Sequence, residues 1–304
     1  MARRHRTLAS AISVTVACAL LVAIVGWVSS ARAQVRAIVS TGCLTAEQAE
    51  ILGHMHIVYL DDGRGGFTKT IRISGVNVQV VNGVGATESS NGLGNLIVGY
   101  QELGNERESD DRTGSHYVVV GQKNNYTRFG GIVSGHSNVA SGNFASTLCG
   151  RRNKADGSWS TILGGGFNLT SGDQSTVCGG DFNWSGSGST VVVGGAGNHA
   201  IAAGNGGAGN QAVVVGGYDN RSKGQGSVIV GGRYNETTAN YSAILAGASN
   251  ICFGDSNGGG SYCAVVGGEG NTTATTTAAT VGGGRNRSAN GLDDWVAGSL
   301  FEDN

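Results

Sequence analysis

The chain of 304 residues contains no proline, and only 13% of its residues are charged. The lack of proline, together with glycines that do not recur at every third position, excludes a collagen-like triple helix. Apolar triplets such as VVV and VIV recur along the chain, and because a disordered chain would leave them in water, disorder is excluded as well. The 55 glycines therefore need a structural explanation in a folded protein.

Positive charge is concentrated at the start of the chain. Three arginines within the first six residues precede an apolar run from Leu8 to Val28, and the small-residue site ARA stands before Gln34, as in an export signal. We expect residues 1–33 to be a signal peptide and the mature protein to be secreted or held at the cell surface. The alternative is an uncleaved anchor, because the run is about long enough to span a bilayer. No membrane span is expected after cleavage.

The remaining chain offers little for nucleic acids, metals or cofactors. Removing the four arginines of the signal from the 20 basic residues leaves 16 against 21 acidic ones, so no nucleic-acid partner is expected. The remaining cysteines form no CxxC pair and no zinc-type spacing with histidine, so neither a metal nor a cofactor is expected. They are Cys43, Cys149, Cys178, Cys252 and Cys263.

Cys252 and Cys263 are the cysteines nearest to each other in the sequence, and an exported protein would allow a disulfide between them. The alternative is a pair of unlinked thiols. The odd number of cysteines after the signal leaves at least one thiol free or intermolecular.

A repeat of about fifteen residues organises the chain from residue 76 to residue 304. Its consensus is Ser-x-[Val/Ile]-[Val/Leu]-Gly-Gly-x-x-Asn, and six or seven extra residues enlarge three of the coils. The asparagines that mark the repeat are Asn138, Asn153, Asn168, Asn183, Asn198, Asn220, Asn235, Asn250, Asn271 and Asn286.

Fifteen residues without helical periodicity suit one coil of a β-solenoid, made of two short strands and two tight bends. The sequence therefore predicts an all-β fold of parallel strands. We expect the glycine pair to supply positive φ angles and close approach of the coils. We also expect the asparagines to adopt the left-handed conformation and to form a ladder along one edge.

The apolar pairs of the repeat, such as Ile162–Leu163 and Val192–Val193, predict burial on both faces of one strand, because adjacent residues of a strand point to opposite sides. One face can fill the interior of the coil. No amphipathic helix is available to cover the other, so we expect other copies of the same chain to cover it.

Residues 34–75 have a different pattern. Thr45 and Gln48 form a plausible capping box for a short helix through Ile51, and alternating strands at HIVYL and KTIRIS flank the turn DDGRGG. We expect a small α/β unit that caps the solenoid. His54 and His56 are expected on one face of the first strand, as solvated or packed side chains rather than metal ligands.

From about residue 77 to residue 300, the period and the segments GVNVQVVNG, NGLGNLIVGY, RTGSHYVVVG and FGGIVSG resemble the YadA-type head of trimeric autotransporter adhesins. The GGxxN motif departs from the Ile-Gly-x-x-Ser/Ala turn usual in that head. The resemblance implies a left-handed parallel β-roll, a homotrimer and an adhesive role. Up to Asn304 no stalk, neck or anchor segment follows the head-like repeats.

Two function classes follow. The first is a non-enzymatic exported structural or adhesive protein, a phage-fibre-like spike included, which presents its side faces and loops to a protein or glycan on a surface or matrix. The second is a polysaccharide-active β-solenoid enzyme, which would need carboxylates gathered on one face. Carboxylates instead gather at residues 102–111, which we expect to be a projecting acidic loop. The GDSNG motif at 254–258 resembles a hydrolase nucleophile elbow, but no helix pattern or later histidine supports that chemistry, and no catalytic residue is assigned.

Overall fold

The computed structural model describes residues 44–201, 211–254, 262–273 and 278–297. The expected signal peptide, Cys43 and residues 255–258 of the GDSNG motif lie outside the described residues. The chain divides into two compact units between Gln79 and Val80, and each is described by itself. The described residues contain no helix with the length and apolar character needed to cross a membrane.

The first unit holds one short helix and an antiparallel hairpin: α3 (Ala46–Gly53), β1 (Met55–Asp61) and β2 (Phe67–Ile73). The helix begins with the expected capping box. The Thr45 hydroxyl accepts from the Gln48 amide at 3.1 Å, and the Gln48 side chain accepts from the Thr45 amide at 2.9 Å. Whether this unit covers an end of the solenoid stays a prediction.

The expectation that His54 and His56 share a strand face is wrong. His54 is the C-cap of α3, and its Nδ1 lies 3.0 Å from the carbonyl oxygen of Ser74. Only His56 belongs to β1. The helix therefore extends two residues further than the pattern predicted, and His54 joins the helix to the hairpin.

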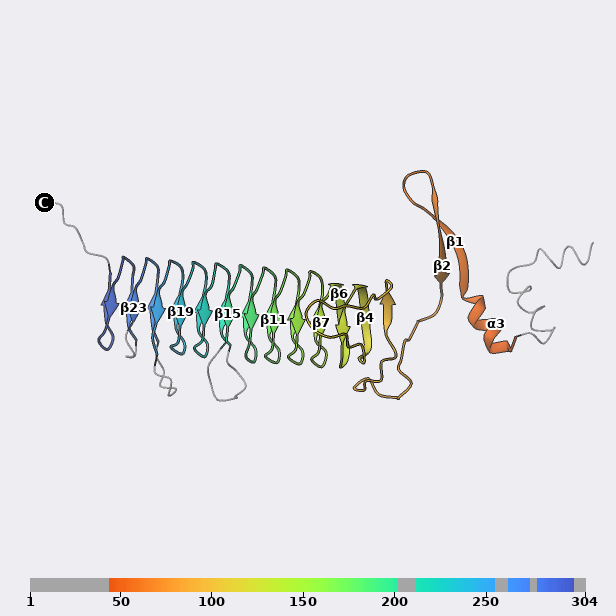
Figure 1. Ribbon diagram of the computed structural model, residues 1–304, viewed down its shortest axis with the longest axis horizontal. Coiled ribbons are helices and arrows are strands. Elements are labelled where there is room, and N and C mark those ends of the chain that lie inside the picture. Colours follow the sequence, from red (N-terminus) through yellow and green to blue (C-terminus); the bar gives the residue numbers. More distant parts are fainter. Residues whose placement is uncertain (1–43, 202–210, 255–261, 274–277, 298–304) are drawn as a thin grey trace, which may run out of the picture. The chain divides into compact units, whose positions relative to one another are not determined.

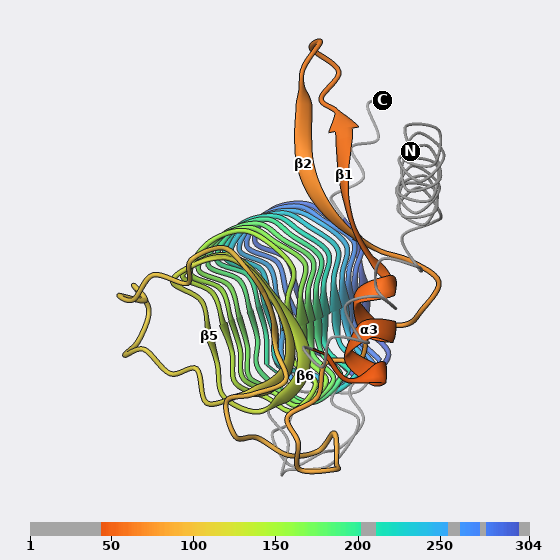
Figure 2. The ribbon, with the colours of Figure 1, turned by 90° about the vertical axis from the view of Figure 1, so that its right-hand side faces the viewer.

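The second unit is the expected β-solenoid with coils of about fifteen residues, confirmed by two parallel sheets whose strands alternate along the chain (Figure 1). Each strand pairs with its counterpart in the next coil, as Thr161 does with Thr176 and Leu169 with Trp184. Figure 2 looks along the stack and shows the coils one behind another.

The 13-stranded sheet consists of β3 (Leu96–Val98), β4 (Ser115–Gln122), β6 (Phe129–His136), β8 (Ser146–Thr147), β10 (Thr161–Ile162), β12 (Thr176–Val177), β14 (Val191–Val192), β16 (Val213–Val214), β18 (Val228–Ile229), β20 (Ala243–Ile244), β22 (Ala264–Val265), β24 (Thr280–Val281) and β26 (Trp295–Val296).

The 11-stranded sheet consists of β5 (Asn125–Tyr126), β7 (Val139–Ala140), β9 (Lys154–Ala155), β11 (Leu169–Thr170), β13 (Trp184–Ser185), β15 (His199–Ala200), β17 (Arg221–Ser222), β19 (Glu236–Thr237), β21 (Ile251–Cys252), β23 (Thr272–Thr273) and β25 (Ser288–Ala289).

The interior is thin because large side chains of one sheet pack against small side chains of the other. The 13-stranded sheet contributes residues such as Ile162, Val192 and Ile229, and the 11-stranded sheet contributes residues such as Ala155 and Ala200, all of them fully buried. This pairing fills the coil without room for a second layer of bulky residues.

The corners of the coil confirm the expected role of the second glycine of each pair and correct that of asparagine. Gly165, the second glycine of its pair, has φ 81°, and a Cβ there would collide with the carbonyl oxygen of Gly180 in the next coil. Phe167, not Asn168, carries the left-handed backbone, with φ 57°. The expectation that the repeated asparagines are left-handed is therefore wrong, except at Asn286, where φ is 54°.

Candidate interaction surface

The outer face of the 13-stranded sheet carries three columns without a charged side chain, from Ser146 to Gly267. We call these columns the uncharged strip. The first column is Ser146, Thr161, Thr176, Val191, Val213, Val228, Ala243 and Ala264; the second is Leu148, Leu163, Cys178, Val193, Val215, Val230, Leu245 and Val266; the third is Cys149, Gly164, Gly179, Gly194, Gly216, Gly231, Ala246 and Gly267.

The second column is the outward half of the apolar pairs. Apart from the half-buried Cys178, its members are 37% to 48% exposed, whereas the inward neighbours, such as Ile162 and Val192, are fully buried. One apolar side chain per coil therefore faces away from the interior. Scattered exposed apolar residues are normal, but a continuous row of them marks an interaction surface.

Most of the third column is small without a requirement among the described residues; Gly164 is the exception, because a Cβ there would lie 2.9 Å from Cys149 Sγ. Gly179, Gly194, Gly216, Gly231 and Gly267 lack positive φ, and an added Cβ would have no heavy atom within 4 Å. Glycine weakens a strand relative to alanine. These glycines leave room beside the second column where the backbone of another molecule could approach.

The outer face of the 11-stranded sheet mixes charged, polar and apolar side chains, and several of its charges are paired with one another. At the outward strand position, which corresponds to the first column of the uncharged strip, it carries Lys154, Leu169, Trp184, His199, Arg221, Glu236, Ile251 and Thr272. Arg221 lies 3.0 Å from Asp219, and Glu236 lies 2.7 Å from Lys223. Charged side chains therefore interrupt the apolar ones along this face.

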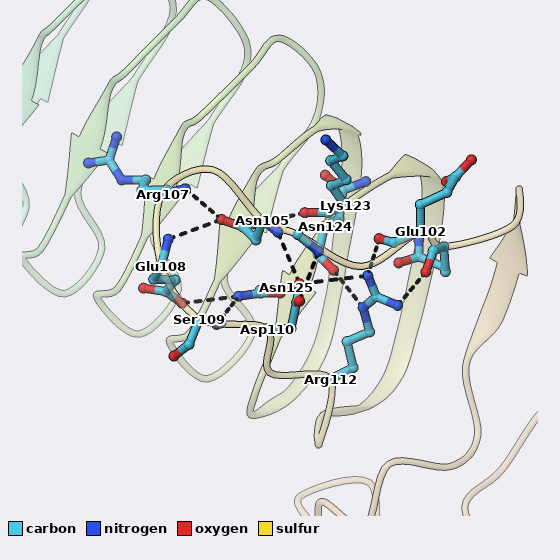
Figure 3. Close-up of polar contacts among 12 residues, drawn as sticks. Glu102, Asn105, Arg107, Glu108, Ser109, Asp110, Arg112, Lys123, Asn124 and Asn125 are labelled. Atoms are coloured by element: carbon cyan, nitrogen blue, oxygen red, sulfur yellow. Dashed lines mark hydrogen bonds and ion pairs between the residues drawn. The ribbon is translucent and has the colours of Figure 1, made fainter.

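The segment of residues 99–114, which we call the acidic loop, folds against the first coils of the 11-stranded sheet. Asn125 Nδ2 donates to the Ser109 carbonyl oxygen at 2.8 Å (Figure 3). The Tyr126 amide donates to the carbonyl oxygen of Asp111 at 3.0 Å, and the Gly114 amide donates to that of Tyr126 at 2.9 Å. The loop therefore occupies the hydrogen-bonding edge of β5, and Val139 on the next strand is fully buried.

Ion pairs hold the acidic loop in place. Glu106 contacts Arg152 and lies 3.6 Å from Lys123 and 3.8 Å from His136, while Glu108 lies 2.9 Å from Lys154. The hydrogen bond from Arg152 lowers the pKa of Glu106 below its ordinary value of 4.5. The acidic loop is thus more than a plain solvated loop, because cations from two coils, Lys123 on one and Arg152 and Lys154 on another, pair with its carboxylates.

The repeated asparagines form a column inside the solenoid. Asn168 Nδ2 donates to the carbonyl oxygens of Gly164 at 3.0 Å and Gly180 at 2.8 Å, and its Oδ1 accepts from the amide of Asn183 at 2.9 Å. The same bonds recur along the buried column of Asn138, Asn153, Asn168, Asn183, Asn198, Asn220, Asn235, Asn250 and Asn271. Each amide closes its own turn and bonds to the next coil.

Two ends of this column differ from the sequence pattern. Asn124 belongs to it, because its Oδ1 accepts from the Asn138 amide at 3.0 Å, but the fourteen-residue step to Asn138 breaks the fifteen-residue pattern. Asn286 does not belong to it. The amide of Arg287 takes that place, 2.9 Å from Asn271 Oδ1, and Asn286 is exposed.

Cys252 and Cys263 are both buried, and no disulfide joins them in the structure. A hydrogen bond between the two thiols, together with burial, raises the pKa of Cys252, and the same hydrogen bond lowers the pKa of Cys263 to about 7. Cys149 is exposed and Cys178 half-buried, both within the uncharged strip. Among the described residues, no three histidine, cysteine or carboxylate side chains gather as metal ligands would.

Comparison with known proteins gives no family: no protein-family model matches the chain, and no curated protein matches it either.

Proposed function

We propose that the protein is a non-enzymatic exported structural or adhesive rod. Parallel copies pack through the uncharged strip, and the charged outer face of the 11-stranded sheet and the loops remain available to a protein or glycan on a host, matrix or cell surface. The observation that carries the proposal is the uncharged strip, an exposed apolar row beside a column of small residues on a solenoid whose other face is charged.

The repeat of the strip supports a second copy as its occupant. The row offers one side chain per coil, at the spacing of neighbouring strands. A partner that matches such a row along many coils needs the same spacing of side chains, and a parallel copy of this chain has that spacing because its sequence is identical. Burial of the second column would remove apolar surface from water in every coil, so the stabilisation grows with the number of coils.

The number of copies is proposed as three, on the resemblance of the repeat to the heads of trimeric autotransporter adhesins. Export rests on the arginines, apolar run and ARA site of residues 1–33. An adhesive role fits a stiff solenoid whose interior is filled by structural side chains, because the outward residues are then free to serve binding.

A pair of matched variants tests the strip. Val215→Asp with Val230→Asp places charges on adjacent coils of the second column, where desolvation of a carboxylate would oppose packing. Thr272→Asp with Ser288→Asp places the same charges on adjacent strands of the other sheet. Sedimentation velocity should show the first variant as a monomer and the second as the wild-type assembly.

Circular dichroism with a thermal melt should show that the first variant still folds, because its substituted side chains are 41% and 44% exposed in one chain. Equal assembly of both variants would contradict the proposal, as would dissociation of both.

A further inference from the structure

One coil of the solenoid carries two cysteines where other coils carry hydroxyl pairs. Strand pairing aligns Ser222 with Thr237 and Thr237 with Cys252. Beside the other sheet, a backbone hydrogen bond of the same kind recurs from coil to coil. The Val213 amide donates to the Ser227 carbonyl oxygen, the Val228 amide to the Ser242 carbonyl oxygen, and the Ala243 amide to the Cys263 carbonyl oxygen. Cys252 and Cys263 therefore stand where Ser222 and Ser227 stand two coils earlier.

The equivalent hydroxyl pairs touch across the interior. Ser222 Oγ lies 2.7 Å from Ser227 Oγ, and Ser185 Oγ lies 2.8 Å from Thr190 Oγ1. The members of each pair come from opposite sheets, so this interior position brings their side chains into contact. The thiols of Cys252 and Cys263 occupy the equivalent interior position and are 0% and 2% exposed.

We propose that Cys252 and Cys263 form a disulfide that joins the two sheets through the interior of one coil. The site takes a small-molecule disulfide, such as oxidised glutathione, as its oxidant. The Cys263 thiolate attacks one sulfur of the oxidant and releases the first glutathione thiolate. The sulfur of Cys252, after losing its proton, then attacks the Cys263 sulfur of the mixed disulfide and releases the second. Two S–H bonds are replaced by one S–S bond, and two electrons and two protons leave with the two glutathione thiols.

The position of the pair gives the bond a structural role. Cys252 and Cys263 flank the longer connection of their coil, where the step from Ile244 to Val265 is 21 residues instead of fifteen. A bond at the base of this connection would close it into a loop and lower the entropy of the unfolded chain. Hydroxyl pairs such as Ser185 and Thr190 hold the equivalent position with a hydrogen bond, and Ala200 and Ala212 fill it with two methyl groups. A disulfide would give the coil of Cys252 and Cys263 a covalent link at this position.

Peptide mass mapping tests the proposal on the full chain. The protein is incubated with oxidised or with reduced glutathione, unfolded, and alkylated without added reductant. After oxidised glutathione, the peptides of Cys252 and Cys263 should be recovered linked to each other and unalkylated, and the melting temperature should rise by roughly 5 °C over that of the reduced protein. Alkylation of both residues after oxidation would overturn the proposal, as would linkage of either one to Cys149 or Cys178.

The double variant Cys252→Ser with Cys263→Ser is the matched control, because it places at this coil a hydroxyl pair like that of Ser222 and Ser227. It should melt at about the temperature of the reduced wild-type protein and show no shift between the two glutathione conditions. The bond lies within one chain, so its formation is independent of self-association. A shift of equal size in this variant would show that another cysteine is responsible and would overturn the proposal.

Discussion

The two sheets of the solenoid come from the same coils, yet their outer faces differ. The 13-stranded sheet turns outward Leu163, Val193 and Val230 without a charge beside them, and the 11-stranded sheet turns outward Lys154, Arg221 and Glu236, each with a partner. The interior side chains and the corner glycines of both sheets stabilise the coil. The difference between the outer faces therefore reports the surroundings of each face, which are water for one and, we propose, other copies for the other.

The largest effect is expected at neighbouring glycines on the edge of the uncharged strip. Gly232→Val should destabilise the chain by about 3 kcal/mol or more, because Gly232 has φ 81° and a Cβ would collide with the Gly247 carbonyl oxygen. Gly231→Val should change stability by only about 0.5 kcal/mol, since its Cβ would be in open space.

Thermal melts compare these two variants in the Val215→Asp/Val230→Asp background, so that self-association does not contribute. Equal losses of stability in the two variants would contradict the claim that the fold of the coil requires Gly232 but not Gly231.

The asparagine column allows a second comparison, between Asn235 inside the column and Asn286 outside it. Asn235→Ala should cost about 2–3 kcal/mol, because it removes the bonds to Gly231 and Gly247 and leaves the buried amide of Asn250 without its acceptor. Asn286→Ala, at an exposed residue outside the column, should cost only about 1 kcal/mol, the strain of alanine at the left-handed φ of 54°. Urea unfolding measures both, and a large loss at Asn286 would contradict the described register of the last coil.

The smallest effect concerns the acidic loop on the 11-stranded sheet. Glu106 has a lowered pKa in the folded state, so its ion pairs stabilise the docked loop above pH 4.5, and this contribution is lost as the pH falls through the lower folded value. Hydrogen exchange should show that protection of the Tyr126 amide, which bonds to Asp111, decreases over that range.

Glu106→Gln should lower this protection at about pH 6 and reduce its dependence on pH. Glu236→Gln, which removes an ion pair of the same sheet away from the loop, serves as control and should leave the Tyr126 amide unchanged. If the protection of the Tyr126 amide changed neither with pH nor in Glu106→Gln, backbone hydrogen bonds alone would dock the loop.

The sequence predicted the coil and its strands because period and apolar pairing recur in almost every unit. It failed where a coil changes length. The step from Asn271 to Arg287 is sixteen residues, and the run Gly282–Gly284 hides which glycine is in register; Gly284, not Gly283, accepts from Asn271 Nδ2. Local patterns cannot locate one extra residue within three identical ones.

Two other features depend on contacts that no local pattern reveals. Aromatic residues disfavour positive φ, yet Phe167 adopts it because the Phe167 amide bonds to the Arg151 carbonyl oxygen of the preceding coil. The cations that pair with the acidic loop are separated along the sequence, and only stacking of the coils brings Lys123, Arg152 and Lys154 to one side. A charge cluster was visible in the sequence, but its partners were not.

The molar mass of the purified wild-type chain tests the central claim most directly. Light scattering at micromolar concentration should give three times the mass of one chain, held over a tenfold dilution, because every coil contributes apolar contact to the interface. A stable, soluble monomer with the uncharged strip open to water would contradict the claim that other copies cover the 13-stranded sheet.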